Sequence, residues 1–69
     1  MKTIDAKIIG ARLRDLRGEK PQKEVADAAG VTAMAVCQYE AGARVPSDQV
    51  KIALAEYFGK TVEEIFFTF

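Results

Sequence analysis

The sequence predicts an all-α fold of five helices in a single domain spanning residues 1–69. Three observations lead to this expectation. Apolar residues recur three or four positions apart in five segments, a residue that favours a helix start precedes each segment, and glycines close three of them. A chain of this length buries about 60% of the surface of its unfolded state, so one small domain is expected.

The first helix is expected from Asp5 to Gly18. Ile9, Leu13 and Leu16 fall at positions i, i+4 and i+7, which places them on one face. Asp5 carries a side chain that can accept hydrogen bonds from the free amides of the first turn. Gly18 is a typical stop, because glycine adopts the backbone conformations that end a helix.

Residues Gln22–Ala41 read as a helix-turn-helix. The second helix starts near Pro21, whose fixed φ suits a first helical turn, and Gly30 ends it with a sharp turn into the third. Thr32 caps the third helix. On that helix Val36 and Tyr39 are expected to face the core, while Ala33, Met34, Cys37 and Gln38 face away from it.

The fourth and fifth helices follow a loop that runs from Ala41 to Pro46. Ser47 caps the fourth helix and Gly59 ends it, with an apolar stripe of Val50, Leu54, Tyr57 and Phe58. Thr61 and Glu64 have the spacing of a capping box, which predicts a short fifth helix carrying Val62, Ile65 and Phe66.

Both ends of the chain have extended, β-prone patterns. Met1–Ile4 alternates polar and apolar residues, and residues 66–69 read Phe-Phe-Thr-Phe. The two termini are expected to pair as short antiparallel strands. The alternative is a frayed N-terminus with an unpaired C-terminal tail.

Composition excludes several classes of protein. No apolar run approaches the ~20 residues of a membrane span, so no membrane association is expected. The single cysteine agrees with a reducing compartment, and we expect a cytoplasmic protein. There is no histidine, and no nucleophile–base or metal-ligand constellation appears, so no enzyme, metal or cofactor is expected.

The charge is zero overall but unevenly distributed. Residues 1–20 carry six Lys/Arg against three Asp/Glu, whereas residues 46–69 carry two against four. Such asymmetry permits one basic face and one acidic face.

An ordered set of motifs across residues 9–66 resembles the Cro/C1-type (XRE-like) helix-turn-helix family of transcriptional regulators. The motifs are Leu16-Arg17, the segment QKEVADAAGV that opens at Gln22, YEAG at 39–42, RVPS at 44–47, KIALAEYF at 51–58 and VEEIF at 62–66. The resemblance implies a lambda-repressor-like domain that binds double-stranded DNA sequence-specifically. It also implies a repressor that acts as a homodimer on a palindromic operator, with helix 32–41 in the major groove.

The resemblance also implies roles for individual residues. Base contacts would come from the outward side of the third helix, at Thr32, Ala33, Met34, Cys37 and Gln38. Phosphate contacts would come from Gln22, Lys23 and Arg44. A structural ion pair would join Arg17 to Glu40. One departure is the connection Gly-Glu-Lys-Pro after Arg17, which is shorter than the usual one and lacks a Ser/Thr cap.

The outward face of the third helix is poor in polar residues. Gln38 can form a bidentate bond to adenine, while Ala33 and Met34 can contact only thymine methyl groups. Much of the specificity is therefore expected to come from DNA shape and dimer spacing. Surplus aromatic residues at the C-terminus predict a dimer interface made by Ile65, Phe66, Phe67 and Phe69.

Two alternative functions remain open. One is an antitoxin that represses its own promoter, and a neighbouring toxin gene would distinguish it. The other is a protein–protein module that has kept the shape and lost DNA binding, which the zero net charge and the apolar Ala33 and Met34 favour. No small-molecule effector is evident.

Overall fold

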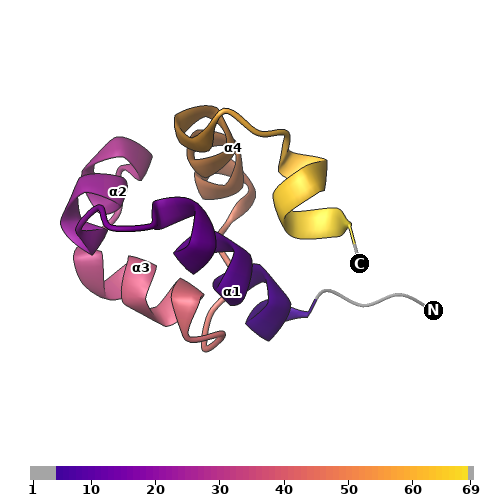
Figure 1. Cartoon of the computed structure of the whole chain (residues 1–69), viewed down its shortest axis with the longest axis horizontal. Helices are drawn as coiled ribbons and strands as arrows, with labels where there is room; N and C mark the ends of the chain where they lie inside the picture. The colour runs from indigo at the N-terminus through magenta and orange to yellow at the C-terminus, as the bar shows by residue number, and fades with distance from the viewer. Residues whose placement is uncertain (1–4, 69) are drawn as a thin grey trace.

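The structure is a computed structural model that describes residues 5–68. In that range the chain forms α1 (Ala6–Arg17), α2 (Gln22–Ala29), α3 (Ala33–Glu40), α4 (Asp48–Phe58) and a C-terminal π-helical segment η1 (Glu63–Phe67). Figure 1 shows α1 and α3 packed against each other, with α2 in contact with both α3 and α4. The predicted all-α fold of five helices is confirmed.

The predicted helix starts depend on side-chain caps. Asp5 Oδ1 accepts from the amides of Lys7 and Ile8, at 3.0 and 3.2 Å, and Thr32 Oγ1 accepts from the amide of Ala35 at 3.1 Å. Ser47 caps α4 in the same way. α2 differs, because Pro21 occupies its N-cap position and supplies no side-chain bond. The helix starts are thus fixed mainly by local bonds that satisfy otherwise free amides.

The predicted capping box at the C-terminus forms. The amide of Thr61 donates to the Glu64 carboxylate at 3.0 Å, and the amide of Glu64 donates to Thr61 Oγ1 at 3.1 Å. The bond from the Thr61 backbone is the main reason that the pKa of Glu64 is lowered; the bond with the Thr61 hydroxyl and the charge of Lys60 add to it.

The predicted pairing of the termini as strands is wrong. Phe66 and Phe67 belong to the helical turns of η1. The capping box starts helical turns, and these bury Ile65 and Phe66 together, whereas a strand would turn neighbouring side chains to opposite faces. Met1–Ile4 and Phe69 lie outside the described residues.

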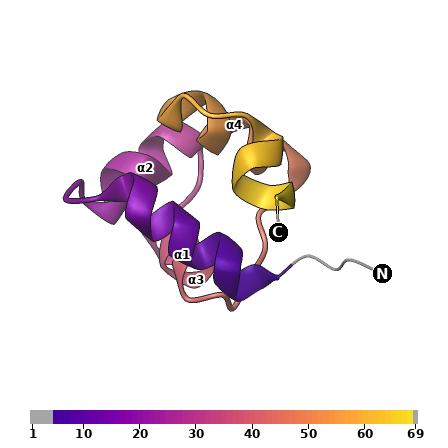
Figure 2. The ribbon, with the colours of Figure 1, turned by 45° about the vertical axis from the view of Figure 1, so that its right-hand side comes forward.

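The core draws on every helix. Its buried residues are Ile9, Leu13, Val25, Ala26, Ala29, Ala35, Val36, Tyr39, Leu54, Ala55, Ile65 and Phe66. Figure 2 shows α4 and η1 together on one side of the molecule and α1 with α3 on the other, so the core fills the space between these pairs. No helix in residues 5–68 is long and apolar enough to cross a membrane.

Gly10 sets how closely α1 and α3 approach. A Cβ atom at this position would lie 2.5 Å from the carbonyl oxygens of both Tyr39 and Glu40. Only glycine therefore allows the backbone of α1 to contact the end of α3. The sequence alone gave no sign of this role, because Gly10 lies inside a helical pattern rather than after one.

Candidate nucleic-acid interface

α3 has one face in the core and one face in solvent. Ala35, Val36 and Tyr39 are buried, at 5%, 3% and 2% exposure. Among the residues expected to contact bases, Thr32, Ala33, Met34 and Cys37 are exposed and Gln38 is half-buried. Met34 is the most exposed of the large apolar residues within residues 5–68, with 69% of its surface exposed.

The turn before α3 fixes the direction in which this face points. Gly30 adopts a left-handed conformation (φ 72°, ψ 30°), and its amide donates back to the end of α2. The amide of Val31 donates to the carbonyl of Ala26 at 2.9 Å, which closes the turn. Ala26 is 1% exposed, and its small side chain allows α2 and α3 to cross closely. The turn and the crossing together hold α3 at the surface.

A hydrogen-bonded group joins the ends of three helices. Arg17 Nε donates to Glu40 Oε2 at 2.7 Å, and Arg17 Nη2 donates to Glu40 Oε1 at 3.0 Å. Gln22 Nε2 donates to the same Oε1 at 3.1 Å. The bond with Glu40 raises the pKa of Arg17, although burial acts in the opposite direction. The ion pair implied by the family resemblance is therefore present, with Gln22 as an additional member.

The short connection between α1 and α2 is compatible with this pair. Arg17 Nη1 donates to the carbonyl of Lys20 at 2.7 Å, and the amide of Lys20 donates to the carbonyl of Arg17 at 3.2 Å. The connection folds back over Arg17, so the guanidinium is held by its own loop as well as by Glu40.

The other two expected phosphate contacts have different surroundings. Lys23 forms an exposed ion pair with Asp27 at 3.4 Å, within the same helix. The guanidinium of Arg44 lies 5.5 Å from the centre of the Tyr39 ring, so the aromatic face supports an exposed cation beside α3.

Residues 8–65 match the family model described as a helix-turn-helix domain. The chain belongs to the helix-turn-helix domain family. The restriction-modification controller protein C.AhdI from Aeromonas hydrophila is 31% identical, with a TM-score of 0.80 over 90% of this chain and 97% of the other. The Cro/C1-type assignment is confirmed, and the fold is that of DNA-binding transcriptional regulators.

Two further solved structures are similar. The SOS-response transcriptional repressor LexA from Eubacterium rectale is 25% identical, with a TM-score of 0.81 over 88% of this chain and 67% of the other. The clp gene regulator ClgR from Corynebacterium glutamicum is 22% identical, covers 94% and 71% of the two chains, and shares the fold with a TM-score of 0.80. No curated protein matches the chain significantly.

The residues expected at a dimer interface differ in their burial. Ile65 and Phe66 are 2% and 0% exposed, so their side chains belong to the core and are covered without a partner. Phe67 is 47% exposed, and Phe69 lies outside the described residues. Ile52 on α4, which the sequence reasoning did not single out, is 52% exposed and lines one hollow with Val62 and Phe67.

Lys51 borders the same hollow and was also missed. It is 7% exposed, its ammonium lies 3.5 Å from the Asp48 carboxylate, and it sits 5.0 Å from the centre of the Phe67 ring. A lysine in an apolar stripe gives no signal in the sequence, since its long aliphatic stem can be buried while its charge finds a partner.

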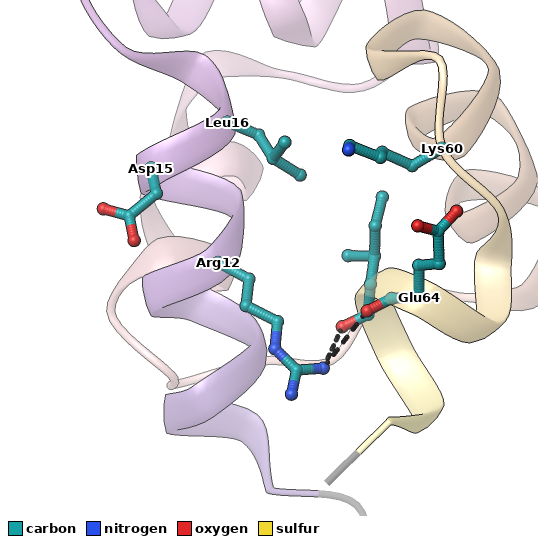
Figure 3. A pocket seen from close by; sticks show the side chains of 6 residues that line it. Arg12, Asp15, Leu16, Lys60 and Glu64 are labelled. Carbon is teal, nitrogen blue, oxygen red and sulfur yellow. Dashed lines mark hydrogen bonds between the residues drawn. The ribbon is translucent and has the colours of Figure 1, made fainter.

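A second hollow, of about 280 Å³, lies between α1 and the C-terminal segment (Figure 3). The guanidinium of Arg12 donates to the carbonyls of Glu64 and Ile65, at 3.4 and 2.9 Å, and also to the carbonyl of Thr68. These bonds satisfy free carbonyls at the end of η1 and fasten it to α1. Arg12 therefore has a structural role, away from the exposed face of α3.

Replacing Glu40 by glutamine is expected to lower the free energy of unfolding by about 1–2 kcal/mol, because Arg17 loses its charged partner in a largely buried place. The side chains of Arg17 and Glu40 are 17% and 7% exposed. The matched control is Lys23→Gln, which removes an ion pair whose side chains are 78% and 67% exposed. Urea unfolding should show that this control loses less than about 0.5 kcal/mol of the free energy of unfolding. Equal losses would contradict the role of Glu40.

Proposed function

We propose that this protein is a transcriptional repressor that binds a palindromic operator as a homodimer, with residues 32–41 in the major groove. The observation that carries the proposal is the division of α3 into two faces. Ala35, Val36 and Tyr39 fix the helix to the core, while Met34 and its outward neighbours make an exposed ridge. A helix displayed in this way has the shape that a major groove admits.

The chemistry of the ridge defines what it can read. Gln38 has both a donor and an acceptor and can pair with the N6 and N7 atoms of adenine. Ala33 and Met34 offer apolar contact with thymine methyl groups. Because few side chains on the ridge can form hydrogen bonds, specificity should also depend on DNA deformation at base pairs that the protein does not contact.

Phosphate contacts would flank the ridge. Arg44 is exposed beside α3 on the Tyr39 ring, and Lys23 and Gln22 lie in the first turn of α2. Helix N-termini attract phosphate because their amides and dipole favour anions. With zero net charge, the chain should have modest nonspecific affinity for DNA.

The homodimer would be formed by the exposed apolar surface of α4 and η1. Ile52, Val62 and Phe67 line a hollow of about 370 Å³ there, and Ile52 and Phe67 are each about half exposed. An exposed patch of this kind is typical of a partner surface. Two recognition helices related by a two-fold axis would then enter successive major grooves about 34 Å apart.

Selection of bound duplexes from random DNA tests the proposed function. The expected result is an inverted repeat whose half-sites are about one helical turn apart, bound with an affinity that falls steeply with salt. The exposed Met34 and the zero net charge favour a protein–protein module as the second candidate. If no sequence is enriched, and if any affinity for mixed-sequence duplex DNA does not change with salt concentration, the protein–protein module is supported instead.

Gln38→Ala is expected to weaken binding by about 1–3 kcal/mol, or roughly five- to 150-fold, and to relax the preference at one base pair in each half-site. The reason is the loss of a bidentate bond to one base. The measurement is a competition assay with every single-base variant of the selected site. Gln49→Ala on α4 is the matched control and should leave the base preference unchanged. An unaltered preference in the Gln38 variant would exclude Gln38 as a base reader.

Ile52→Ser is expected to convert a dimer into a monomer, because it places a hydroxyl in the apolar patch that a second copy would cover. Sedimentation equilibrium over a range of concentrations measures the change. Ile8→Ser is the matched control, since Ile8 is 41% exposed on α1 and does not line the hollow. A wild-type chain that stays monomeric, or an equal effect of both variants, would contradict this interface.

A further inference from the structure

A third hollow, of about 250 Å³, lies where α1 ends, α2 begins and α3 ends. It is lined by Arg14, Arg17, Gln22, Cys37, Glu40 and Ala41. Cys37 and Ala41 are exposed on the same side of α3 as the proposed base-reading residues. The hollow therefore opens beside the surface that would face DNA.

The hydrogen bonds in this hollow engage both oxygens of Glu40 and leave one amide hydrogen of Gln22 without a partner in the described part of the chain. A carboxylate can only accept, so the bond to Glu40 fixes the amide group of Gln22 with its nitrogen inward. That nitrogen carries two hydrogens, and Glu40 uses one of them. Arg17 and Gln22 already occupy Glu40, with three bonds to its two oxygens. The negative charge of Glu40 is therefore paired with Arg17 within the protein itself.

Arg14 adds a positive charge that this network does not neutralise. It lies in the last turn of α1 and is exposed. Among residues 5–68, no carboxylate forms an ion pair with it. Two arginines therefore face one glutamate in the hollow, which leaves a net charge of about +1 there. Gln22, the first residue of α2, lines the same space, so the positive end of the α2 dipole lies beside it.

We propose that this hollow binds one phosphate group of the DNA backbone, held by the guanidinium of Arg14 and the second amide hydrogen of Gln22. The proposal rests on the proposed function and adds Arg14 to the residues that position the protein on the duplex. Glu40 is then a positioning residue, because it orients the Gln22 amide without contacting DNA. Guanidinium groups suit this task because they form strong, charge-assisted bonds to phosphate.

The first test measures the salt dependence of binding for Arg14→Gln. Neutralising one phosphate contact should reduce the slope of log affinity against log salt by about 0.9, on a selected operator and on a mixed-sequence duplex of about two helical turns alike. Lys60→Gln removes the same charge from an exposed residue in the loop before η1 and should leave the slope unchanged. Arg14→Lys should keep most of the slope, because it keeps the charge.

The second test uses operators in which a single phosphate is replaced by a neutral methylphosphonate. Replacement at one position should weaken binding by the wild type and by Arg14→Lys, and it should weaken binding by Arg14→Gln less, because that variant keeps only the bond from Gln22. Equal losses for all three proteins at every position, or an unchanged salt slope in Arg14→Gln, would overturn the role of Arg14 while leaving DNA binding intact. A wild-type chain that binds neither duplex would overturn the proposed function itself.

Discussion

Phe66→Ala is expected to lower the free energy of unfolding by about 3–5 kcal/mol. Phe66 is 0% exposed and ranks first by volume among the fully buried side chains of residues 5–68. Domains of this size have a total stability of only about 5–10 kcal/mol, so the variant should be partly unfolded under conditions where the wild type is native. Urea unfolding followed by circular dichroism measures the difference.

Phe67→Ala is the matched control for this experiment. The same substitution at the next residue removes a side chain that is 47% exposed, and it should cost less than about 1 kcal/mol when the protein is dilute enough to be monomeric. Similar losses for both variants would contradict the placement of Phe66 in the core and Phe67 at the surface.

Gly10→Ala is expected to destabilise the protein by about 1–3 kcal/mol, although alanine is the better helix former. The added Cβ would meet the carbonyl oxygens of Tyr39 and Glu40 at 2.5 Å, and backbone atoms cannot move aside as a flexible side chain can. α1 and α3 must therefore separate. The measurement is again urea unfolding, combined with DNA affinity, because Glu40 is part of the bonds that hold the end of α3.

Ala11→Gly provides the control for helix propensity at the neighbouring exposed position. It should cost about 0.5–1 kcal/mol, which is the intrinsic difference between the two residues in a helix. If steric contact did not matter at position 10, Gly10→Ala would gain about what Ala11→Gly loses. A gain in stability in the Gly10 variant would therefore refute the close contact.

The elements that the sequence predicted well are those fixed by near neighbours. Three helices are capped by Asp5, Thr32 and Ser47, which accept hydrogen bonds from amides two or three residues away. These caps could be predicted because Asp, Thr and Ser are residue types that favour the N-cap position. Gly30 and Gly59 end helices in the left-handed conformation for the same local reason.

The features that sequence reasoning missed depend on residues far apart in the chain. Gly10 is required because residues 39 and 40 pass beside it, and the buried Lys51 has its ammonium beside the rings of Phe66 and Phe67. The strand expected at the C-terminus failed because aromatic residues favour strands in general, while the local capping box and the demand for burial at Phe66 favour helical turns.

The candidate site shows the same division. The division of α3 into buried and exposed faces follows from helical spacing, so Val36 and Tyr39 could be predicted. The pair of Arg17 and Glu40 came from the family resemblance, since nothing local links residues 23 positions apart. The bond from Gln22 to Glu40 could not be predicted, because it depends on how the start of α2 packs beside the end of α3.

The bonds to Glu40 have a consequence for the thermodynamics of recognition. Arg17 and Gln22 hold the last turn of α3 from two other helices, so this part of the proposed binding surface has its final shape before DNA is present. Preorganisation of this kind transfers the loss of side-chain entropy from the binding step to the folding step. When such an ordered surface binds, we expect the DNA to deform more than the protein does.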